Sequence, residues 1–232
     1  MSGERLIVRN WSGPGFGPLD FSLSDGSFVW LEGGRPTTAV AAVDCLCGLQ
    51  ESTAGEVRWF GRDLAALGES GRLDLAKQIA HVRVDGGLLA NLRVWENVVL
   101  PVRQRFSTSE VDDLEAEILA AFAACGRDEE RAGRLLQERV EELSDGEQVL
   151  VMLVRGHLNR PEVVLCERAF GGLPDEELDE CRRLLDWMAT QHPGLALLVI
   201  GDEAPPDGRF GLSAWGDPEI LRLEEGGPWH AS

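Results

Sequence analysis

The pattern of hydrophobic and polar positions changes character along the chain. Short apolar runs bounded by glycine and proline predict strands at residues 6–10 and 28–32. An apolar stretch at 38–49 predicts a helix directly after the second strand, and the segment 55–64 alternates like a β-hairpin or an edge strand. In many α/β folds, a strand, a glycine turn and a helix in this order present backbone N–H groups to a phosphate.

The middle of the chain takes up helical spacing. Residues 107–125 place Leu114, Ile118, Ala121 and Phe122 on one face, and residues 129–143 form a second, strongly charged helical region. The last third returns to alternation, with helices at 147–159 and 175–191 and strands at 163–166, 195–200 and near 220–223. This order predicts one α/β domain over residues 1–232. We expect a mostly parallel core sheet, an N-terminal antiparallel β part, and a helical subdomain inserted at about 86–158.

Composition narrows the classes of partner. The chain has 232 residues and a net charge of −18, from 40 acidic and 22 basic residues. Such a charge repels phosphodiester backbones and anionic lipid surfaces, so we expect no nucleic-acid partner. No apolar run approaches the ~20 residues that span a bilayer, which predicts a cytoplasmic chain without direct membrane insertion. The five cysteines contain no CxxC pair, which favours reduced, buried thiols.

Four segments occur in the order and spacing of a known family. They are CGLQESTAGEVRWFGRDL, LLANLRVWENVVLPV, LSDGEQ and NRPEVVLCERAFGGLP. On these segments the chain resembles the ATP-binding subunit of an ATP-binding-cassette (ABC) transporter from about Leu6 to Leu223. The resemblance implies a P-loop NTPase-like fold, membrane permease subunits as partners, and a second ATPase subunit or a second copy of the chain. It also implies a peripheral position on the inner face of the cell membrane. Within the family, GGLLANLRVWENV and ERAFGGLP look most like the ATPases of phospholipid (Mla/MCE-type) transport systems.

The phosphate loop of the resemblance is degenerate. Aligning Cys47, Gly48 and Leu49 with the family's AGL and counting back places Gly33 at the first glycine. A phosphate cradle needs free N–H groups, glycine geometry and a cation. Proline and threonine replace the two later glycines, alanine replaces the lysine, and valine with alanine replace the serine and threonine. The loop positions are then Gly33, Gly34, Arg35, Pro36, Thr37, Thr38, Ala39, Val40 and Ala41.

A shifted register would make Arg35 the cation and Thr37 the metal ligand. It would also put the required upstream glycine at Val29, inside a predicted strand, and the helix would no longer meet Gly48 in step. The chain's one lysine, Lys77, lies far from the loop, so no lysine can supply the missing ammonium.

The other positions that serve hydrolysis in the family are altered too. Val84 stands at the Q-loop glutamine, Arg168 at the catalytic glutamate, Gly201 at the switch histidine and Pro174 at the D-loop aspartate. Glu167 stands at the Walker B aspartate, where its carboxylate could still meet a metal. A guanidinium is always protonated, so it cannot serve as the general base.

The magnitudes separate hydrolysis from binding. Loss of a general base costs roughly 10²–10⁴ in rate, and the metal ligand and phosphate cation are missing as well. Loss of one charge-assisted phosphate contact costs ~1.5–3 kcal/mol, or about one to two decades of affinity. We therefore expect no hydrolysis and no required cofactor, while weak binding of ATP and Mg²⁺ stays open.

The signature segment has two interpretations. Ser144, Asp145, Gly146, Glu147 and Gln148 follow Leu143, and the family's signature reaches the γ-phosphate held by the other subunit. Ser144 followed three residues later by Glu147 is also a capping box, and two carboxylates would repel a triphosphate unless they point away from it. The segment either completes a partner's site or only caps a helix.

Two apolar sets complete the candidate sites. Leu88, Leu89, Leu92 and Trp95 lie where the family receives a coupling helix of the permease, and we expect Trp95 to be the exposed member; the alternative is that they support the core. The adenine-stacking aromatic would be Trp11 or Phe16, unless WSGPGFGP is only a turn.

Three functions remain. The leading one is a non-hydrolysing subunit that docks on a permease, pairs with another ATPase subunit and serves lipid transport. The others are a weakly active ATPase that uses a rearranged loop, and a scaffold or regulator that keeps only the fold.

Overall fold

The fold is known from a computed structural model that describes residues 3–33, 35–83, 87–103, 112–201, 203–204 and 210–224. Of the residues named above, Gly34, Val84 and residues 107–111 of the predicted helical stretch 107–125 lie outside these ranges. The N-terminal half contains β1 (Glu4–Gly13), β2 (Phe16–Ser24), β3 (Phe28–Gly33), α1 (Pro36–Cys47), β4 (Ala54–Trp59), β5 (Arg62–Asp63), a 3₁₀ turn (Leu64–Ala66), α2 (Glu69–Gln78), β6 (Ile79–Arg83) and α3 (Val94–Arg103). The C-terminal half contains α4 (Asp112–Cys125), α5 (Glu129–Gln137), a 3₁₀ turn (Val140–Glu142), α6 (Asp145–Leu158), β7 (Val163–Glu167), α7 (Asp175–Gln191), β8 (Ala196–Ile200) and β9 (Glu219–Leu223).

The strands form two sheets. One is antiparallel in the order β2-β1-β4-β5, and the other has the order β6-β7-β8-β3-β9 with every pair parallel. In the parallel sheet, Arg83 is level with Glu167, and Glu167 is level with Ile200. The carboxyl ends of these strands therefore meet at one edge, which is where α/β folds place their ligands.

Two hydrophobic cores lie on opposite faces of the parallel sheet. On β3, Phe28 and Trp30 belong to one core, and Val29 and Leu31 belong to the other, as the two-residue period of a strand requires. All residues of β7 and β8 are buried, because helices or the second sheet cover both faces.

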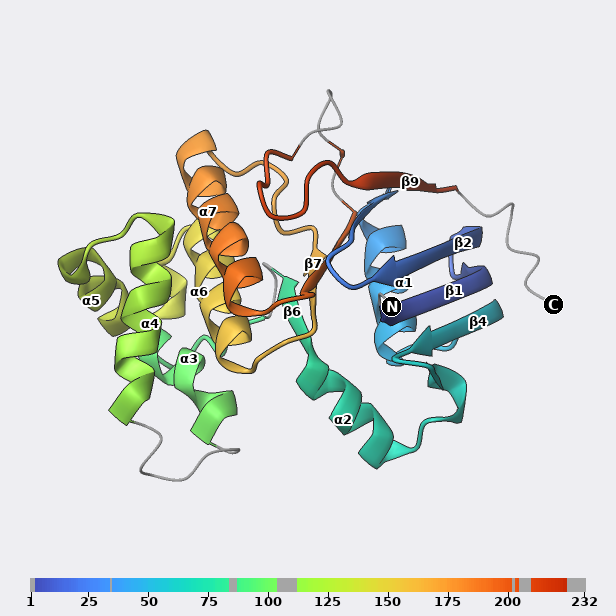
Figure 1. The fold of residues 1–232 in the computed structure, drawn as a ribbon, viewed down its shortest axis with the longest axis horizontal. Helices are drawn as coiled ribbons and strands as arrows, with labels where there is room; N and C mark the ends of the chain where they lie inside the picture. Colours follow the sequence, from blue (N-terminus) through green and yellow to red (C-terminus); the bar gives the residue numbers. More distant parts are fainter. Residues whose placement is uncertain are drawn as a thin grey trace.

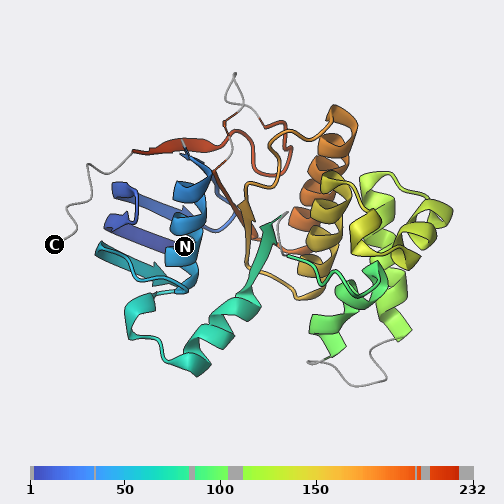
Figure 2. The same ribbon diagram turned by 180° about the vertical axis from the view of Figure 1, so that it is seen from behind.

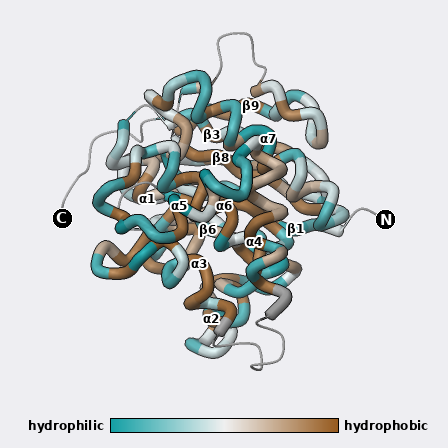
Figure 3. The backbone as a smooth tube through the Cα atoms, turned by 90° about the vertical axis from the view of Figure 1, so that its left-hand side faces the viewer, coloured by the Kyte–Doolittle hydropathy of each residue, from teal (hydrophilic) through white to brown (hydrophobic). Residues whose placement is uncertain are grey.

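The helices divide between these two faces. Helix α1 contacts β1 on one side and β3, β7 and β8 on the other, so it lies between the two sheets (Figure 1). Helices α6 and α7 pack on the opposite face, with α3, α4 and α5 beyond them, and the view from behind shows the same separation (Figure 2). Helix α3 is mainly hydrophobic (Figure 3). Of the helices in the described ranges, none is both long and apolar enough to span a bilayer.

The predicted fold class is confirmed, whereas several details differ. The charged region 129–143 is not one helix, because it breaks at Glu138 and ends in a 3₁₀ turn. The segment WSGPGFGP is a hairpin turn at residues 14–15 that joins β1 to β2, in agreement with the interpretation of this segment as a turn. Trp11 and Phe16 are buried against each other, with ring centroids 4.5 Å apart, so neither is exposed to stack on adenine.

Candidate functional site

Three positions in the first turn of α1, within the part of the chain that the structure describes, have no free N–H group to offer a phosphate. Pro36 is the first residue of α1 and has no N–H group. The N–H groups of Thr38 and Ala39 both donate to the carbonyl of Arg35, at 3.0 and 3.2 Å. Arg35 itself is extended and exposed, with no side-chain cap on the helix. A phosphate cradle would direct these N–H groups at its ligand. Here they are already bonded to a carbonyl of the same chain.

The lysine position and the switch position pack against each other. Ala39 is fully buried. A Cβ atom built on Gly201 would lie 2.5 Å from Ala39 Cβ and 2.8 Å from Arg168 Cγ, and Gly201 has a φ of 102°. A Cβ atom on Gly33 would in turn lie 3.2 Å from Gly201 Cα. Neither position has room for a larger side chain unless the surrounding residues move.

Of the remaining loop positions, only Thr37 and Thr38 carry a side-chain oxygen. Val40 and Ala41 are half-buried in α1 and carry no oxygen in their side chains. Thr37 is exposed, and Thr38 is buried. Among the residues that the structure describes, no group of three or more His, Cys, Asp or Glu side chains could hold a metal ion.

Glu167 ends β7 with a buried carboxylate that already has protein partners. Its side chain is 4 % exposed. One oxygen, Oε2, lies 2.9 Å from His81 Nε2, and the other, Oε1, lies 3.8 Å from Arg83 Nη2. Both partners come from β6, the strand paired with β7. The carboxylate that would face a metal is therefore held by a histidine and an arginine of the same chain.

The charges of Glu167 and Arg83 also affect the pKa of Cys47, at the end of α1. Burial raises the pKa of the Cys47 thiol to about 12, the nearby Glu167 charge adds to the rise, and Arg83 partly opposes it. The thiol therefore stays protonated near neutral pH and is not an activated nucleophile.

Arg168 follows β7 in a left-handed conformation, with a φ of 48°. Its N–H group donates to the Ile200 carbonyl at 2.9 Å, and its residue surface is exposed. The structure thus brings the positions of the Walker B carboxylate, the catalytic base and the switch to one sheet edge, with a guanidinium where the base would stand. Asp202, beside the switch position, lies outside the described residues.

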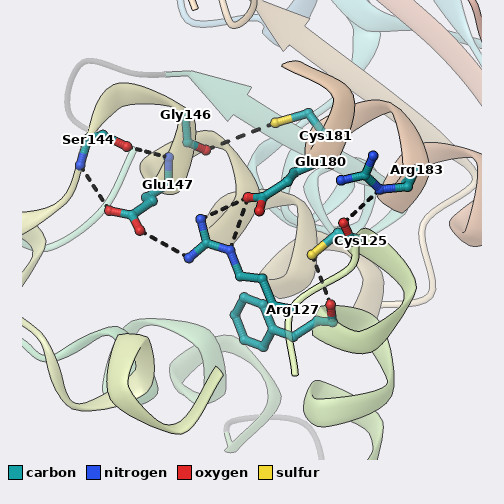
Figure 4. A network of polar contacts seen from close by, with 9 residues as sticks. Cys125, Arg127, Ser144, Gly146, Glu147, Glu180, Cys181 and Arg183 are labelled. Atoms are coloured by element: carbon teal, nitrogen blue, oxygen red, sulfur yellow. Dashed lines mark hydrogen bonds and ion pairs between the residues drawn. The ribbon is translucent and has the colours of Figure 1, made fainter. Parts of the chain in front are cut away.

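The signature segment begins α6 and forms the predicted capping box (Figure 4). The N–H of Glu147 donates to Ser144 Oγ at 3.1 Å, and Glu147 Oε2 accepts the N–H of Ser144 at 3.2 Å. Gly146 is buried so tightly that a Cβ atom there would meet the Glu177 side chain at 2.2 Å. Gln148 is half-buried, and its amide lies 3.4 Å from the Leu143 carbonyl.

The two acidic residues of the segment point different ways. Asp145 is exposed in the first turn of α6. Glu147 turns inward, where its Oε1 accepts from Arg127 at 3.0 Å, and the same guanidinium donates to Glu180 of α7 at 2.8 and 3.0 Å (Figure 4). Only one of the two carboxylates therefore remains at the helix surface.

The predicted permease contact is divided between core and surface. Leu88 is buried, and Leu92 and Trp95 are half-buried, with Trp95 packed against the larger core. Leu89 is 49 % exposed, so the expectation that Trp95 is the exposed member is wrong. The Trp95 side chain lies on the face of α3 that packs against the larger core. Leu89, on the loop before α3, faces outward.

The loop that carries Leu89 is braced by a buried asparagine. Asn97, 1 % exposed, accepts from the N–H of Leu89 at 2.7 Å and donates to the carbonyls of Leu89 and Arg93 at 3.1 Å each. An asparagine can satisfy donors and acceptors of one backbone segment at once. Its position inside WENV was the available signal in the sequence, and our sequence reasoning did not use it.

Mg²⁺ and a nucleotide triphosphate fit these residues poorly. Magnesium prefers oxygen ligands and retains water, whereas Glu167 is paired and no hydroxyl stands at 40 or 41. A triphosphate needs a cation and free amides, whereas Ala39 packs against Gly201 and the amides of Thr38 and Ala39 are bonded within the chain. Sequence reasoning also missed His81, Arg83 and Arg127, because their roles depend on strand register and on helix packing.

Comparison with known proteins places these features in a family. The sequence profile of the family described as ABC transporter matches residues 16–170, more than half of the chain. The chain is 29% identical over 210 residues to the lipoprotein-releasing system ATP-binding protein LolD of Chromohalobacter salexigens, covering 90% of this chain and 82% of that protein. It is 26% identical over 168 residues to the cell division ATP-binding protein FtsE of Escherichia coli, covering 72% of each.

Solved structures agree on the fold. A dimeric post-hydrolysis state of the ATP-binding cassette MJ0796, bound to ADP and Pi, aligns with a TM-score of 0.73 at 19% identity over 94% of both chains. CbiO1 of Clostridium perfringens, part of the transporter complex cbiONQ, aligns with a TM-score of 0.71 at 16% identity over 97% of this chain and 86% of that one. At these identities the likeness concerns the fold alone.

Family membership supports part of what the sequence predicts. ATP-binding subunits of this kind work with membrane permeases and in pairs, which agrees with the predicted classes of partner. They also bind ATP with Mg²⁺, so membership does not bear out the expectation that no cofactor is required. On the match to its profile and on its fold, the chain belongs to the ATP-binding subunits of ABC transporters.

Proposed function

We propose that this chain is a degenerate, non-hydrolysing ATP-binding-cassette subunit of a membrane transporter. It docks on a permease and pairs with another ATPase subunit. The observation that carries the proposal is the state of Glu167, a 4 % exposed carboxylate bonded to His81 at the position where the family binds its metal.

A metal ion would have to compete with the chain's own cations. To reach Glu167, Mg²⁺ would displace His81 from Oε2 and lie beside the positive charge of Arg83. It would find no hydroxyl at positions 40 and 41, where the family's serine or threonine completes the ligands, because these residues are valine and alanine. Loss of the metal ligand, of the lysine and of the free amides at Thr38 and Ala39 removes three kinds of contact to Mg·ATP, at ~1.5–3 kcal/mol each. Affinity for Mg·ATP should therefore fall by about three decades or more.

The hydrolytic step lacks its base as well. Arg168 cannot accept a proton from water, and this loss alone costs roughly 10²–10⁴ in rate. The sequence left open an alternative that uses Arg35 and Glu167. That alternative would require Glu167 to leave His81 and the first turn of α1 to reopen.

Docking on a permease has support from exposed apolar side chains. Leu89 projects from the loop that Asn97 braces, and Leu100 of α3 is 39 % exposed. The end of α1 and helix α2 line a cavity of about 730 Å³, with Leu49 and Leu73 exposed at its edge. Helices α2 and α3 lie along the same lower side of the molecule in Figures 1 and 2. Exposed leucines on two neighbouring segments are candidates for contact with an apolar partner segment.

Pairing with another ATPase subunit has support from the signature segment. Because Glu147 turns toward Arg127, Asp145 is the acidic residue of the segment that is exposed at the start of α6. Ser144 is exposed, and its hydroxyl can donate a hydrogen bond while its oxygen accepts from Glu147. The segment thus keeps a donor that could serve a nucleotide held by the partner.

We place the cargo among lipids or lipid-anchored proteins. The support is the likeness to a lipoprotein-releasing ATP-binding protein and the resemblance of GGLLANLRVWENV and ERAFGGLP to phospholipid transport ATPases. We also propose that residues 1–232 form a single domain, with a helical subdomain inserted at about 86–158.

The test is affinity purification of the tagged chain from native membranes in mild detergent. We expect a permease and a second ATPase subunit with an intact phosphate loop. Hydrolysis by the complex should disappear when the partner's loop lysine is replaced and persist in Glu167→Gln of this chain. A complex that contains only copies of this chain, and whose hydrolysis is lost in Glu167→Gln, would overturn the proposal.

A further inference from the structure

Far from the sheet edge, a cluster of polar side chains joins three helices. It contains Glu117 of α4, His157 of α6 and His192, which caps the C-terminal end of α7. His157 is 1 % exposed, although histidine is rarely buried so fully without partners. None of these residues belongs to the candidate nucleotide site or to the apolar docking surface.

The contacts form a chain from one helix to the next. His157 Nε2 lies 3.0 Å from Glu117 Oε1, and His157 Nδ1 lies 2.9 Å from His192 Nε2. Arg160, just after α6, binds the same Glu117 carboxylate, with one contact at 3.1 Å. Trp187 of α7 covers the His157 ring, with centroids 4.6 Å apart. The cluster therefore spans α4, α6 and α7 through His157.

The geometry limits how many protons the two rings can hold. A carboxylate only accepts, so we assign the hydrogen of the neutral His157 ring to Nε2, the nitrogen that lies 3.0 Å from Glu117 Oε1. Between His157 Nδ1 and His192 Nε2, one nitrogen must be bare, because two N–H groups cannot face each other at 2.9 Å. At most one of the two rings can be an imidazolium while the contact is kept.

The charges that face the cluster set the same limit. Glu117 supplies one negative charge, and Arg160 already supplies one positive charge against it. One imidazolium brings the cluster to a net charge of +1, and a second brings it to +2 around a fully buried His157 and a half-buried His192. Two rings whose centroids are 4.8 Å apart would then repel each other directly.

The titration of the groups agrees with this limit. Burial, together with the charges of His157 and Arg160, lowers the pKa of His192 to about 4 from 6.5. Burial opposes ionisation of Glu117, yet contacts with His157 and Arg160 outweigh it and lower the pKa of that carboxyl. Both pKa values are lowered on folding, so both groups stabilise the fold at neutral pH and lose that contribution as the pH falls. For His192 the loss runs from about pH 6.5 down to about 4.

We propose that Glu117, His157 and His192 form an acid-sensitive clamp that fastens α4 and α7 to the end of α6. The clamp is closed while one ring remains neutral, and it opens when both rings are protonated. A short turn after His192 connects α7 to β8. When the clamp opens, α4 and α6 lose their contacts with the C-terminal end of α7, and the residues of the candidate nucleotide site take no part in this change.

The experiment follows the four histidine rings of the full chain by NMR between pH 8 and 4, together with urea unfolding over the same range. We expect the His192 ring to stay neutral at pH 5.5 in the wild type. In His157→Gln its pKa should rise toward the ordinary value, because one of the charges that lower it is removed while burial remains. The titration of His192 alone should lower the folding equilibrium constant by at most about 30-fold between pH 7.5 and 5, and by less because the ring is partly exposed. The variant His192→Gln should lack this part of the pH dependence.

His230→Gln, in the C-terminal segment outside the described residues, is the matched control and should change nothing. If His157→Gln does not fold, His192→Gln and the wild-type ring titration still decide the matter. A His192 ring that titrates near pH 6.5 in the wild type would overturn the proposal. So would an acid dependence of unfolding that is identical in His192→Gln.

Discussion

Removal of the Arg127 guanidinium is expected to loosen the start of α6 from α7. In the wild type this one group donates to Glu147 at 3.0 Å and to Glu180 at 2.8 and 3.0 Å. Arg127→Ala would leave two carboxylates without their cation, and the Glu180 side chain is only 11 % exposed.

The magnitude follows from the burial of the partners. Removing one member of a buried ion pair costs about 3–5 kcal/mol, because the other charge stays buried and unpaired. The side chains of Arg127 and Glu147 are 12 % and 25 % exposed, so water recovers part of the loss. We expect a fall of about 2–4 kcal/mol in the free energy of unfolding, a large part of the ~5–15 kcal/mol typical of a domain.

Urea unfolding at pH 7.5 and constant ionic strength measures this change. Arg127→Lys keeps the charge but cannot bridge both carboxylates, so it should lose about half as much. Arg131→Ala removes an exposed arginine one turn along and should stay within about 0.5 kcal/mol. Arg127→Ala with a loss no larger than that of Arg131→Ala would refute the assigned role of the guanidinium.

Three further predictions concern the site and the docking surface. Ala39→Lys should lower stability by about 1–3 kcal/mol without creating Mg·ATP binding, since the position is fully buried; urea unfolding and nucleotide titration check both parts, and a gain of binding would count against us. His81→Ala should cost about 1–3 kcal/mol, because Glu167 keeps only a distant cation, whereas Lys77→Ala at an exposed pair should cost nearly nothing. Leu89→Asp should abolish co-purification with a permease and leave the unfolding midpoint unchanged; retained binding would remove that leucine from the interface.

The sequence predicted the elements whose pattern is local. Strands with two-residue alternation, the strand-to-helix turn at residue 33 and α7 all appear close to where periodicity places them. The capping box of Ser144 and Glu147 was predicted as well, because it depends on a spacing of three residues within one helix. Element β2 was missed because glycine and proline interrupt its first residues.

The parts of the site that the sequence could not predict depend on contacts between distant segments. His81 and Arg83 reach Glu167 only because β6 pairs with β7 in one particular register. Arg127 meets Glu180 across two helices, 53 residues apart in the chain. The absence of a lysine at 39 was visible in the sequence, whereas the close packing of Ala39 on Gly201 required coordinates.

Titration of the purified chain with ATP, with and without Mg²⁺, tests the central claim most directly. If the buried carboxylate of Glu167 is held by His81 and Arg83 rather than by a metal, binding should be weaker than about 1 mM and should not respond to Mg²⁺. Micromolar binding that depends on Mg²⁺ and is lost in Glu167→Gln would contradict it.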